Sequence, residues 1–338
     1  MSAAADLRTE RQGKTAYFCI HLGSNINCMK KLLFCFLAYV SFLSVNVFGQ
    51  TAGEIDLSFN PDDAGYGIGD GATSDIWALC LQPDGKIIAS GNFTAFNHFN
   101  SASIVRLNPD GSIDSSFHIG SGANAAIIEV VLQSDNKILI GGHFTSFNGY
   151  ACGRIARLNV DGSLDTSFHI GTGADDVVGS IALQSDGKIL IAGGFQTFNG
   201  QEAIQMLRLN QDGSIDSSFS SGTGTDGYIL SVAVQSDNRA IVGGDFSHYN
   251  GVFRNRILRL NIDGSVDSSF VPLAEADSWI YHLKIQDDGK IILCGEFNNV
   301  SGVARQKIAR LNADGSLDSS FNVSFWGKIP RLQAKTLV

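Results

Sequence analysis

The stretch that decides the fold is LQSDGKILIAGGF (residues 183–195), followed after a loop by RLNQDGSIDSSF (residues 208–219). Copies of both strings recur on either side of this pair. The string Asn-x-Asp-Gly-Ser begins at Asn108, Asn159, Asn210, Asn261 and Asn312, a constant interval of 51 residues. A strict period of about 50 residues predicts a propeller or an array, because each unit buries its apolar faces only against its neighbours.

The 183–219 unit has the pattern of an antiparallel meander. Asp186-Gly187 and Asp212-Gly213 each separate two apolar runs. Asp-Gly between apolar runs is typical of a two-residue type I′ hairpin turn. Each unit should therefore hold four strands, named a, b, c and d in chain order, which is the size of one propeller blade. The sequence predicts an all-β protein, a β-propeller of four-stranded antiparallel blades with five repeats visible.

Closure of the ring is left open by the sequence. Residues 54–59 repeat strand d with no strand a, b or c before them, and the pattern stops after Phe321. Either five blades form a ring with a redundant strand and a divergent tail (residues 322–338), or the ring is incomplete. We favour the incomplete ring because no further a-b-c set follows to join the orphan strand d.

The N-terminal segment has the pattern of an export signal. Met29-Lys30-Lys31 is a basic start, residues 32–48 are nearly all apolar, and Val47-Phe48-Gly49 resembles a cleavage site. The interpretation is a signal peptide over residues 29–49, an upstream extension over residues 1–28 and a propeller over residues 50–321. A retained membrane anchor is the alternative. We expect a bacterial protein that is secreted or held at the cell surface or envelope, with no membrane insertion after signal cleavage.

The charge balance narrows the class of partner. The chain has 33 acidic and 24 basic residues, for a net charge of −9. Phosphates of nucleic acids need clustered cations, and the chain has no Lys/Arg cluster. We therefore expect no nucleic-acid partner and no binding to an anionic membrane surface.

An Arg and an Asp recur in every unit. Strand c carries Arg106, Arg157, Arg208, Arg259 and Arg310, and strand d carries Asp114, Asp165, Asp216, Asp267 and Asp318. A charge placed in every blade should be paired, since an unpaired buried guanidinium is costly. The sequence predicts that each Arg pairs with a strand-d Asp of its own or a neighbouring blade. The alternative is a set of solvated edge charges.

These fixed letters carry a family resemblance. The combination LQ-x-D-G-K-I-L-I-x-G-x-F, N-G and R-L-N-x-D-G-S-x-D-x-S-F, over roughly residues 54–321, resembles the delta-60 repeat family. That family comprises predicted β-propellers of bacterial exported and cell-surface proteins. The resemblance implies a secreted propeller. It transfers no catalytic residue, because the family has no settled biochemical activity.

The loop between strands d and a supplies a candidate metal site. A polar residue recurs nine positions before the Gln that opens each turn between strands a and b. Four of these residues are candidate ligands: Asn124, Asp175, Asp226 and Asp277. A ring of carboxylates could hold Ca²⁺, which takes oxygen ligands. The alternative is that each Asp accepts hydrogen bonds from its own loop backbone, as in Asx turns. Calcium is the one cofactor under consideration.

The loop between strands b and c differs most between units and is the candidate ligand surface. Aromatic side chains together with Arg suit a glycan or protein surface. The candidate ligand-binding residues are His98, Phe99, Tyr150, Tyr249, Phe253 and Arg254 from these loops, together with Trp279 beside strand a of the last unit.

An enzyme would need ionisable groups that converge on one point. Glu129 and His282 share one strand-a position and could serve as acid and base. No phosphate-binding loop, nucleophile elbow or zinc spacing accompanies them. The preferred function is a non-catalytic binding or display scaffold for an extracellular glycan or protein. The alternatives are a calcium-stabilised lectin or adhesin and a carbohydrate-active enzyme.

Overall fold

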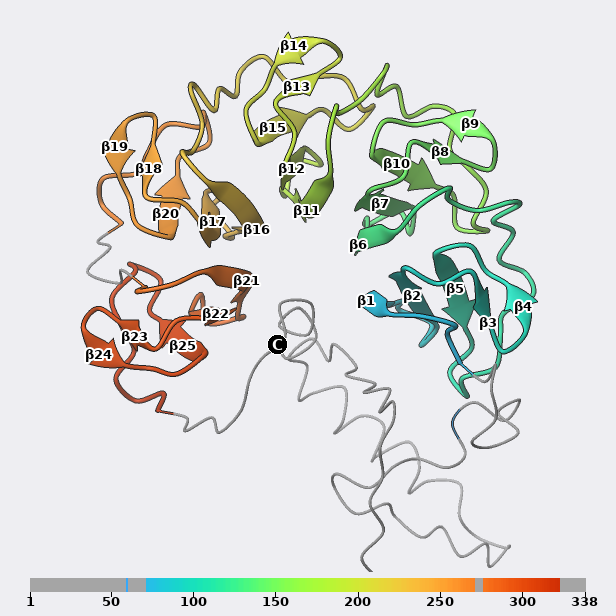
Figure 1. Cartoon of the computed structure of the whole chain (residues 1–338), viewed down its shortest axis with the longest axis horizontal. Helices are drawn as coiled ribbons and strands as arrows, with labels where there is room; N and C mark the ends of the chain where they lie inside the picture. The colour runs from blue at the N-terminus through green and yellow to red at the C-terminus, as the bar shows by residue number, and fades with distance from the viewer. Residues whose placement is uncertain (1–58, 60–70, 271–275, 323–338) are drawn as a thin grey trace, which may run out of the picture.

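The computed structural model describes residues 59, 71–270 and 276–322. The predicted upstream extension, the signal peptide and all but the first residue of the tail lie outside these residues. Within them every regular element is a β-strand, and five similar units follow one another in an arc around a common centre (Figure 1). The predicted all-β propeller of five repeats is confirmed, and the described residues leave its ring open between the fifth unit and the first.

Each unit, called blade 1 to blade 5 in chain order, contains a three-stranded antiparallel sheet in the order a-b-c. The a strands are β1 (Ile76–Leu81), β6 (Ile127–Leu132), β11 (Val178–Leu183), β16 (Tyr228–Val234) and β21 (Ile280–Ile285). The b strands are β2 (Ile87–Gly91), β7 (Ile138–Gly142), β12 (Ile189–Gly193), β17 (Ala240–Asp245) and β22 (Ile291–Gly295). The c strands are β5 (Ile104–Leu107), β10 (Ile155–Leu158), β15 (Met206–Leu209), β20 (Ile257–Leu260) and β25 (Ile308–Leu311). The a strands lie nearest the centre (Figure 1).

The predicted fourth strand is reduced to a single bridge in every blade, between Leu209 and Ile215 in blade 3 for example. The next residue, Asp216, ends the pairing. Its side chain accepts hydrogen bonds from the backbone N–H and the hydroxyl of Ser218, and its carbonyl accepts one from the Phe219 N–H. These local bonds turn the chain away from the sheet, so strand d cannot extend.

The two hairpin turns also differ from the predicted two-residue type. In the a–b turn of blade 3 the Gly187 N–H donates to the Gln184 carbonyl and the Gln184 N–H donates to the Lys188 carbonyl. Gly187 alone has a positive φ, of 83°. This is a type I turn followed by a left-handed residue, the usual three-residue hairpin loop. Asn136 and Asn238 take the left-handed position in blades 2 and 4, with φ of 63° and 66°.

The b strands form the centre of each blade and are buried along their length in all five units, except at Asp245, the half-buried last residue of β17. Apolar side chains from neighbouring blades pack together between the sheets. Leu190 of blade 3, for example, belongs to the same cluster as Ile229 and Val232 of blade 4. Because both faces of a central blade are covered, its strands are broadly apolar and do not alternate.

The predicted Arg–Asp pairing is confirmed in all five blades. Each strand-c Arg donates through Nε to the Asp of its own blade at 2.6–2.8 Å. In blade 3 the side chains of Arg208 and Asp216 are only 2% and 9% exposed. A cation of the a–b turn reaches the same carboxylate, and Lys188 Nζ lies 2.8 Å from Asp216 Oδ2. The Phe219 ring lies under the guanidinium of Arg208, at 5.1 Å.

These carboxylates predict acid lability. Partial burial raises the pKa of Asp216, but hydrogen bonds from Lys188, Ser218 and Arg208 outweigh it and hold the pKa well below its usual range. Asp114, Asp165 and Asp267 behave in the same way. The unfolded chain, with an ordinary pKa of about 3.9, takes up these protons first as the pH falls. The melting temperature should therefore hold above about pH 5 and fall steadily below about pH 4. A melting temperature that stays flat from pH 6 to pH 2.5 would contradict this.

Candidate functional site

The segment between strands b and c forms a short hairpin in every blade, which the sequence had not predicted. The hairpin strands are β3 (Ala95–Phe96) and β4 (Phe99–Asn100), β8 (Ser146–Phe147) and β9 (Tyr150–Ala151), β13 (Thr197–Phe198) and β14 (Gln201–Glu202), β18 (His248–Tyr249) and β19 (Val252–Phe253), and β23 (Asn299–Val300) and β24 (Val303–Ala304). These rim hairpins lie on the outer perimeter of the arc (Figure 1). The five hairpins are therefore separated from one another along the perimeter and do not gather at the centre of the arc.

The base of each rim hairpin is fixed by a buried side chain. The second residue of its first strand is Phe in blades 1 to 3, Tyr249 in blade 4 and Val300 in blade 5, and all are at most 1% exposed. A bridge joins this residue to the d–a loop, as between Phe198 and Ala174. The base thus belongs to the blade core.

The candidate metal ligands hold the same base. Asp175 Oδ1 accepts hydrogen bonds from the N–H groups of Gln196 and Thr197, at 2.9 and 3.0 Å. Partial burial raises the pKa of Asp226, but bonds from the backbone and ring of His248 outweigh it and lower the pKa to about 2. The equivalent oxygens of Asn124, Asp226 and Asp277 accept from the same two positions of their own hairpins. The acceptor role of the alternative interpretation is thus present, although the donors belong to the hairpin and not to the loop itself.

These candidate metal ligands do not come together. Each lies in a different blade, and in the described part of the chain no group of three or more His, Cys, Asp or Glu side chains is placed to hold a metal ion. The second oxygens of two of them have protein partners. Asp226 Oδ2 lies 2.8 Å from His248 Nδ1, and Asp277 Oδ2 accepts from Asn299 Nδ2 at 2.8 Å. Three of the four candidates carry carboxylates that could bind calcium, but in the described part of the chain they do not form one shared site.

The tips of the rim hairpins are exposed in every blade. Phe99, Tyr150 and Phe253 are 61%, 59% and 51% exposed. His98 lies at the turn of the blade 1 tip, exposed and with a φ of 68°. The tips of the other blades present Gln201 and Glu202, or Val303 and Ala304. The predicted surface residues at these positions are therefore accessible, and their chemistry changes from blade to blade.

The rim hairpin of blade 4 combines an aromatic contact with a His–Asp pair. The His248 ring packs edge-on against Phe253, with ring centroids 5.5 Å apart, and its Nδ1 lies 2.8 Å from Asp226 Oδ2. His248 and Asp226 are each nearly half exposed. An exposed aromatic face thus stands beside a polar pair on one hairpin. The sequence missed His248, although its position opposite Phe253 follows once the hairpin register is known.

Three other predicted ligand residues have different surroundings. Tyr249 is fully buried and its hydroxyl donates to the Gly264 carbonyl at 3.1 Å, so its prediction as a surface contact is wrong. Arg254 is half-buried beside Phe253, and its Nη1 donates to the Phe253 carbonyl at 2.7 Å. Trp279 lies half-buried before β21, and its ring packs edge-on against Tyr281 at 6.0 Å. It belongs to the inner part of blade 5 and not to a rim hairpin.

The acid and base considered for an enzyme lie on different a strands. Glu129 is on β6 and His282 on β21, with β11 and β16 between them along the arc (Figure 1). The equivalent serines join neighbouring a strands: Ser231 Oγ accepts from the Leu283 N–H at 3.1 Å. This position therefore serves contacts between blades.

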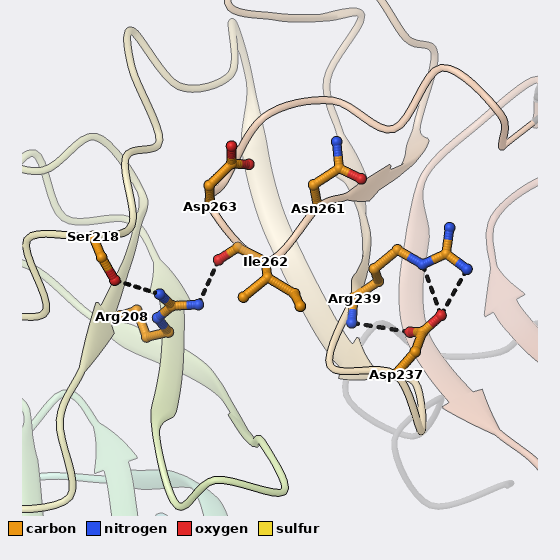
Figure 2. Close-up of a pocket in the computed structure, with 7 residues that line it drawn as sticks. All are labelled: Arg208, Ser218, Asp237, Arg239, Asn261, Ile262 and Asp263. Atoms are coloured by element: carbon orange, nitrogen blue, oxygen red, sulfur yellow. Dashed lines mark hydrogen bonds and ion pairs between the residues drawn. The ribbon is translucent and has the colours of Figure 1, made fainter.

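A pocket of 620 Å³ lies at the junction of blades 3 and 4, on the side of the a–b and c–d turns. Figure 2 shows its lining, which comprises Arg208, Ser218, Asp237, Arg239, Asn261, Ile262 and Asp263. Both cations are already engaged, since Arg239 pairs with Asp237 and Asp267 and Arg208 with Asp216. A similar pocket occurs one junction earlier, beside Lys137 and Arg157. The cations that line these two grooves between blades are all paired with carboxylates, so neither groove offers a free cation to an anionic ligand.

Comparison with known proteins places the chain by family. No curated protein matches it. Similar solved structures include the extracellular domain of a one-component system from B. thetaiotaomicron (12% identity, TM-score 0.43), of which this chain covers 27% with 70% of its own length. A protein of unknown function from Bacteroides caccae (13%, 0.41) is matched over 72% of this chain and 80% of that one. A gluconolactonase from Xanthomonas campestris (13%, 0.41) is matched over 65% and 69%.

No described residue belongs to a helix long and apolar enough to cross a membrane.

A family model matches five segments, residues 82–117, 133–168, 184–219, 235–270 and 286–321. Each match runs from the Gln of the a–b turn to the Phe that packs on the strand-c Arg, so it covers strands b and c and the rim hairpin of one blade and leaves out strand a. The chain therefore belongs to the family described as the domain of unknown function (DUF5122) beta-propeller.

Proposed function

We propose that the chain is an exported, cell-surface or secreted propeller of the delta-60 repeat type that acts as a non-catalytic binding scaffold. The observation that carries this proposal is the division of each rim hairpin into a constant base and a variable tip. The base is held by a buried side chain and by a polar acceptor, which is Thr73 in blade 1 and Asp or Asn in the others, whereas the tip is exposed in all five blades. The backbone of the hairpin repeats from blade to blade, while the exposed side chains on it differ. This is the arrangement of a recognition surface on a rigid support.

The chemistry of the tips favours an extracellular glycan or protein as the ligand. Exposed aromatic rings offer flat apolar contact area at a low entropic cost, and neighbouring polar groups fix orientation. Phe253 with His248 and Asp226 provides both on one hairpin. The acidic net charge of −9 is unsuited to nucleic acid.

A glycan array and a panel of extracellular proteins, probed with the labelled full chain, test this proposal. We expect Phe253→Ala and Tyr150→Ala to weaken binding of a captured ligand by about tenfold, the effect of roughly 1.4 kcal/mol. Val303→Ala, at an equally exposed tip without an aromatic ring, is the matched control and should change binding little. Equal binding by all three variants would place recognition elsewhere than on the rim.

Two added arms of the same experiment separate the alternative functions. Binding that persists with chelator supports the metal-free scaffold, because the Asp175 carboxylate already accepts two backbone N–H groups. Binding that is lost with chelator and restored by Ca²⁺ would favour the calcium-stabilised lectin. Conversion of the captured glycan during prolonged incubation, abolished by replacing Glu129 and His282 together, would favour the enzyme.

A further inference from the structure

Four junctions between consecutive blades are built from the same contacts. The strand-c Arg of one blade donates through Nη1 to a backbone carbonyl in the Asn-x-Asp-Gly turn of the next, as Arg157 does to Gln211 at 2.6 Å and Arg259 to Ala313 at 2.8 Å. Arg106 and Arg208 reach Val160 and Ile262 in the same way. Between residues that the structure describes, the backbone adds a bond at three junctions, such as His169 N–H to the Asp212 carbonyl at 2.7 Å.

At three of the four junctions an aromatic ring lies directly against the turn glycine, and at the junction of blades 3 and 4 the Ser220 backbone lies there instead. A Cβ built on Gly162 would lie 2.8 Å from the ring of Phe117, and one on Gly315 would lie 2.8 Å from the ring of Phe270. Each ring belongs to the preceding blade. The turn therefore docks on an Arg and a Phe of its neighbour, and glycine is needed both for this close approach and for its positive φ.

In the described part of the chain, blade 5 presents the first half of such a junction without the second. Arg310 is held by its own blade, with Nε 2.8 Å from Asp318 Oδ2 and the Phe321 ring 4.8 Å from the guanidinium. Among the described residues, no carbonyl accepts from Arg310 Nη1. The Arg310 side chain is 21% exposed, against 2–7% for the other four. Ile308 is likewise half-buried where its four equivalents are fully buried.

Blade 1 does not offer a free complement to this surface. Phe59 packs in one cluster with Ile113 of blade 1, as Phe270 packs with Leu317 of blade 5. The place that a neighbour's Phe takes on a turn-bearing blade is therefore already filled on blade 1 by its own chain. A second copy docking head to tail would have to displace Phe59 before its Phe321 could enter.

We infer that the edge of blade 5 formed by Ile308, Arg310 and Phe321 is a docking surface for one further β-meander unit with an Asn-x-Asp-Gly turn. That unit supplies a backbone carbonyl to Arg310 Nη1 and a glycine to the face of Phe321. Its apolar a strand covers Ile308. This surface is continuous with four junctions of known geometry, and it is independent of the rim ligand proposed above.

The test inserts a copy of residues 220–270 after Phe321 in the full chain and compares Arg310→Gln in the original and the extended protein. We expect Arg310→Gln to lower the melting temperature of the extended chain by about 6 °C or more, as a filled junction should. In the original chain the same variant should cost less than half of that. Arg259→Gln, at a junction filled in both proteins, is the matched control and should cost the same in each.

Several results would overturn the inference. An Arg310→Gln penalty that is equal in the two proteins would mean that the added unit does not engage Arg310. Rapid trypsin cleavage of the added unit in an otherwise resistant chain would mean that it does not dock. If the copy of 220–270 prevents folding, a copy of 169–219 takes its place, and failure of both overturns the proposal. Sedimentation of the original chain as a dimer that Arg310→Gln dissociates would assign the surface to a second copy instead.

Discussion

Replacing Arg208 with glutamine should lower the free energy of unfolding by about 3 kcal/mol, the lower end of the cost of breaking a buried ion pair. The guanidinium is 2% exposed and donates to Asp216, to the Ser218 hydroxyl and, across the junction, to the Ile262 carbonyl. Glutamine is too short to serve all three and carries no charge. The cost stays at the lower end because Lys188 keeps Asp216 paired.

Urea unfolding of the full chain measures this effect, with the midpoint and slope fitted for each variant. Arg254→Gln is the matched control, because Arg254 is only half-buried and its Nη1 donates to the carbonyl of its own neighbour Phe253. It should change the free energy of unfolding by no more than about 0.5 kcal/mol. Equal values for the two variants would show that the contacts of Arg208, within its blade and across the junction, do not stabilise the propeller.

The blade architecture was predictable because its signals are long-range and repeated. Five copies at one interval identify the unit. Every copy has an Arg and an Asp at equivalent positions, Arg208 and Asp216 in blade 3, and this repetition predicts that the two side chains pair. The details that failed depend on local hydrogen bonds. The Asp216 carboxylate turns the chain toward Ser218, which ends strand d after one bridge. The same residue type, Asp, thus favours a turn through its side chain where apolar neighbours suggest a strand.

The site was less predictable because exposure depends on the pairing register. Tyr249 and Phe253 are four residues apart in one hairpin, yet one is fully buried and the other 51% exposed. A signal was present in the repeats, since the position of Tyr249 is occupied by Phe96, Phe147 and Phe198 in blades 1 to 3. An apolar column of that kind indicates core. The position of Phe253 is occupied by Asn100, Ala151 and Glu202 in blades 1 to 3. A column that varies in this way indicates an exposed position.

The division between base and tip leads to a second large effect, in blade 3. Phe198→Ala should lower the free energy of unfolding by about 3–5 kcal/mol, because truncating a fully buried Phe removes apolar contacts and leaves a cavity. The Phe198 ring is 0% exposed and packs in the largest core cluster, which spans blades 1 to 3. Its backbone also bridges to Ala174 of the d–a loop. The loss should therefore loosen the rim hairpin together with the blade.

Phe99→Ala supplies the comparison, because it removes the same ring from an exposed tip. Phe99 is 61% exposed, so its truncation should change the free energy of unfolding by no more than about 0.5 kcal/mol. Urea unfolding of both variants distinguishes a constant base from a replaceable tip. If Phe99→Ala were as costly as Phe198→Ala, the tips would be structural, and their variation from blade to blade would not be explained by ligand recognition. If only Phe198→Ala is costly, side chains at the tips can change without loss of the fold, as a scaffold for binding requires.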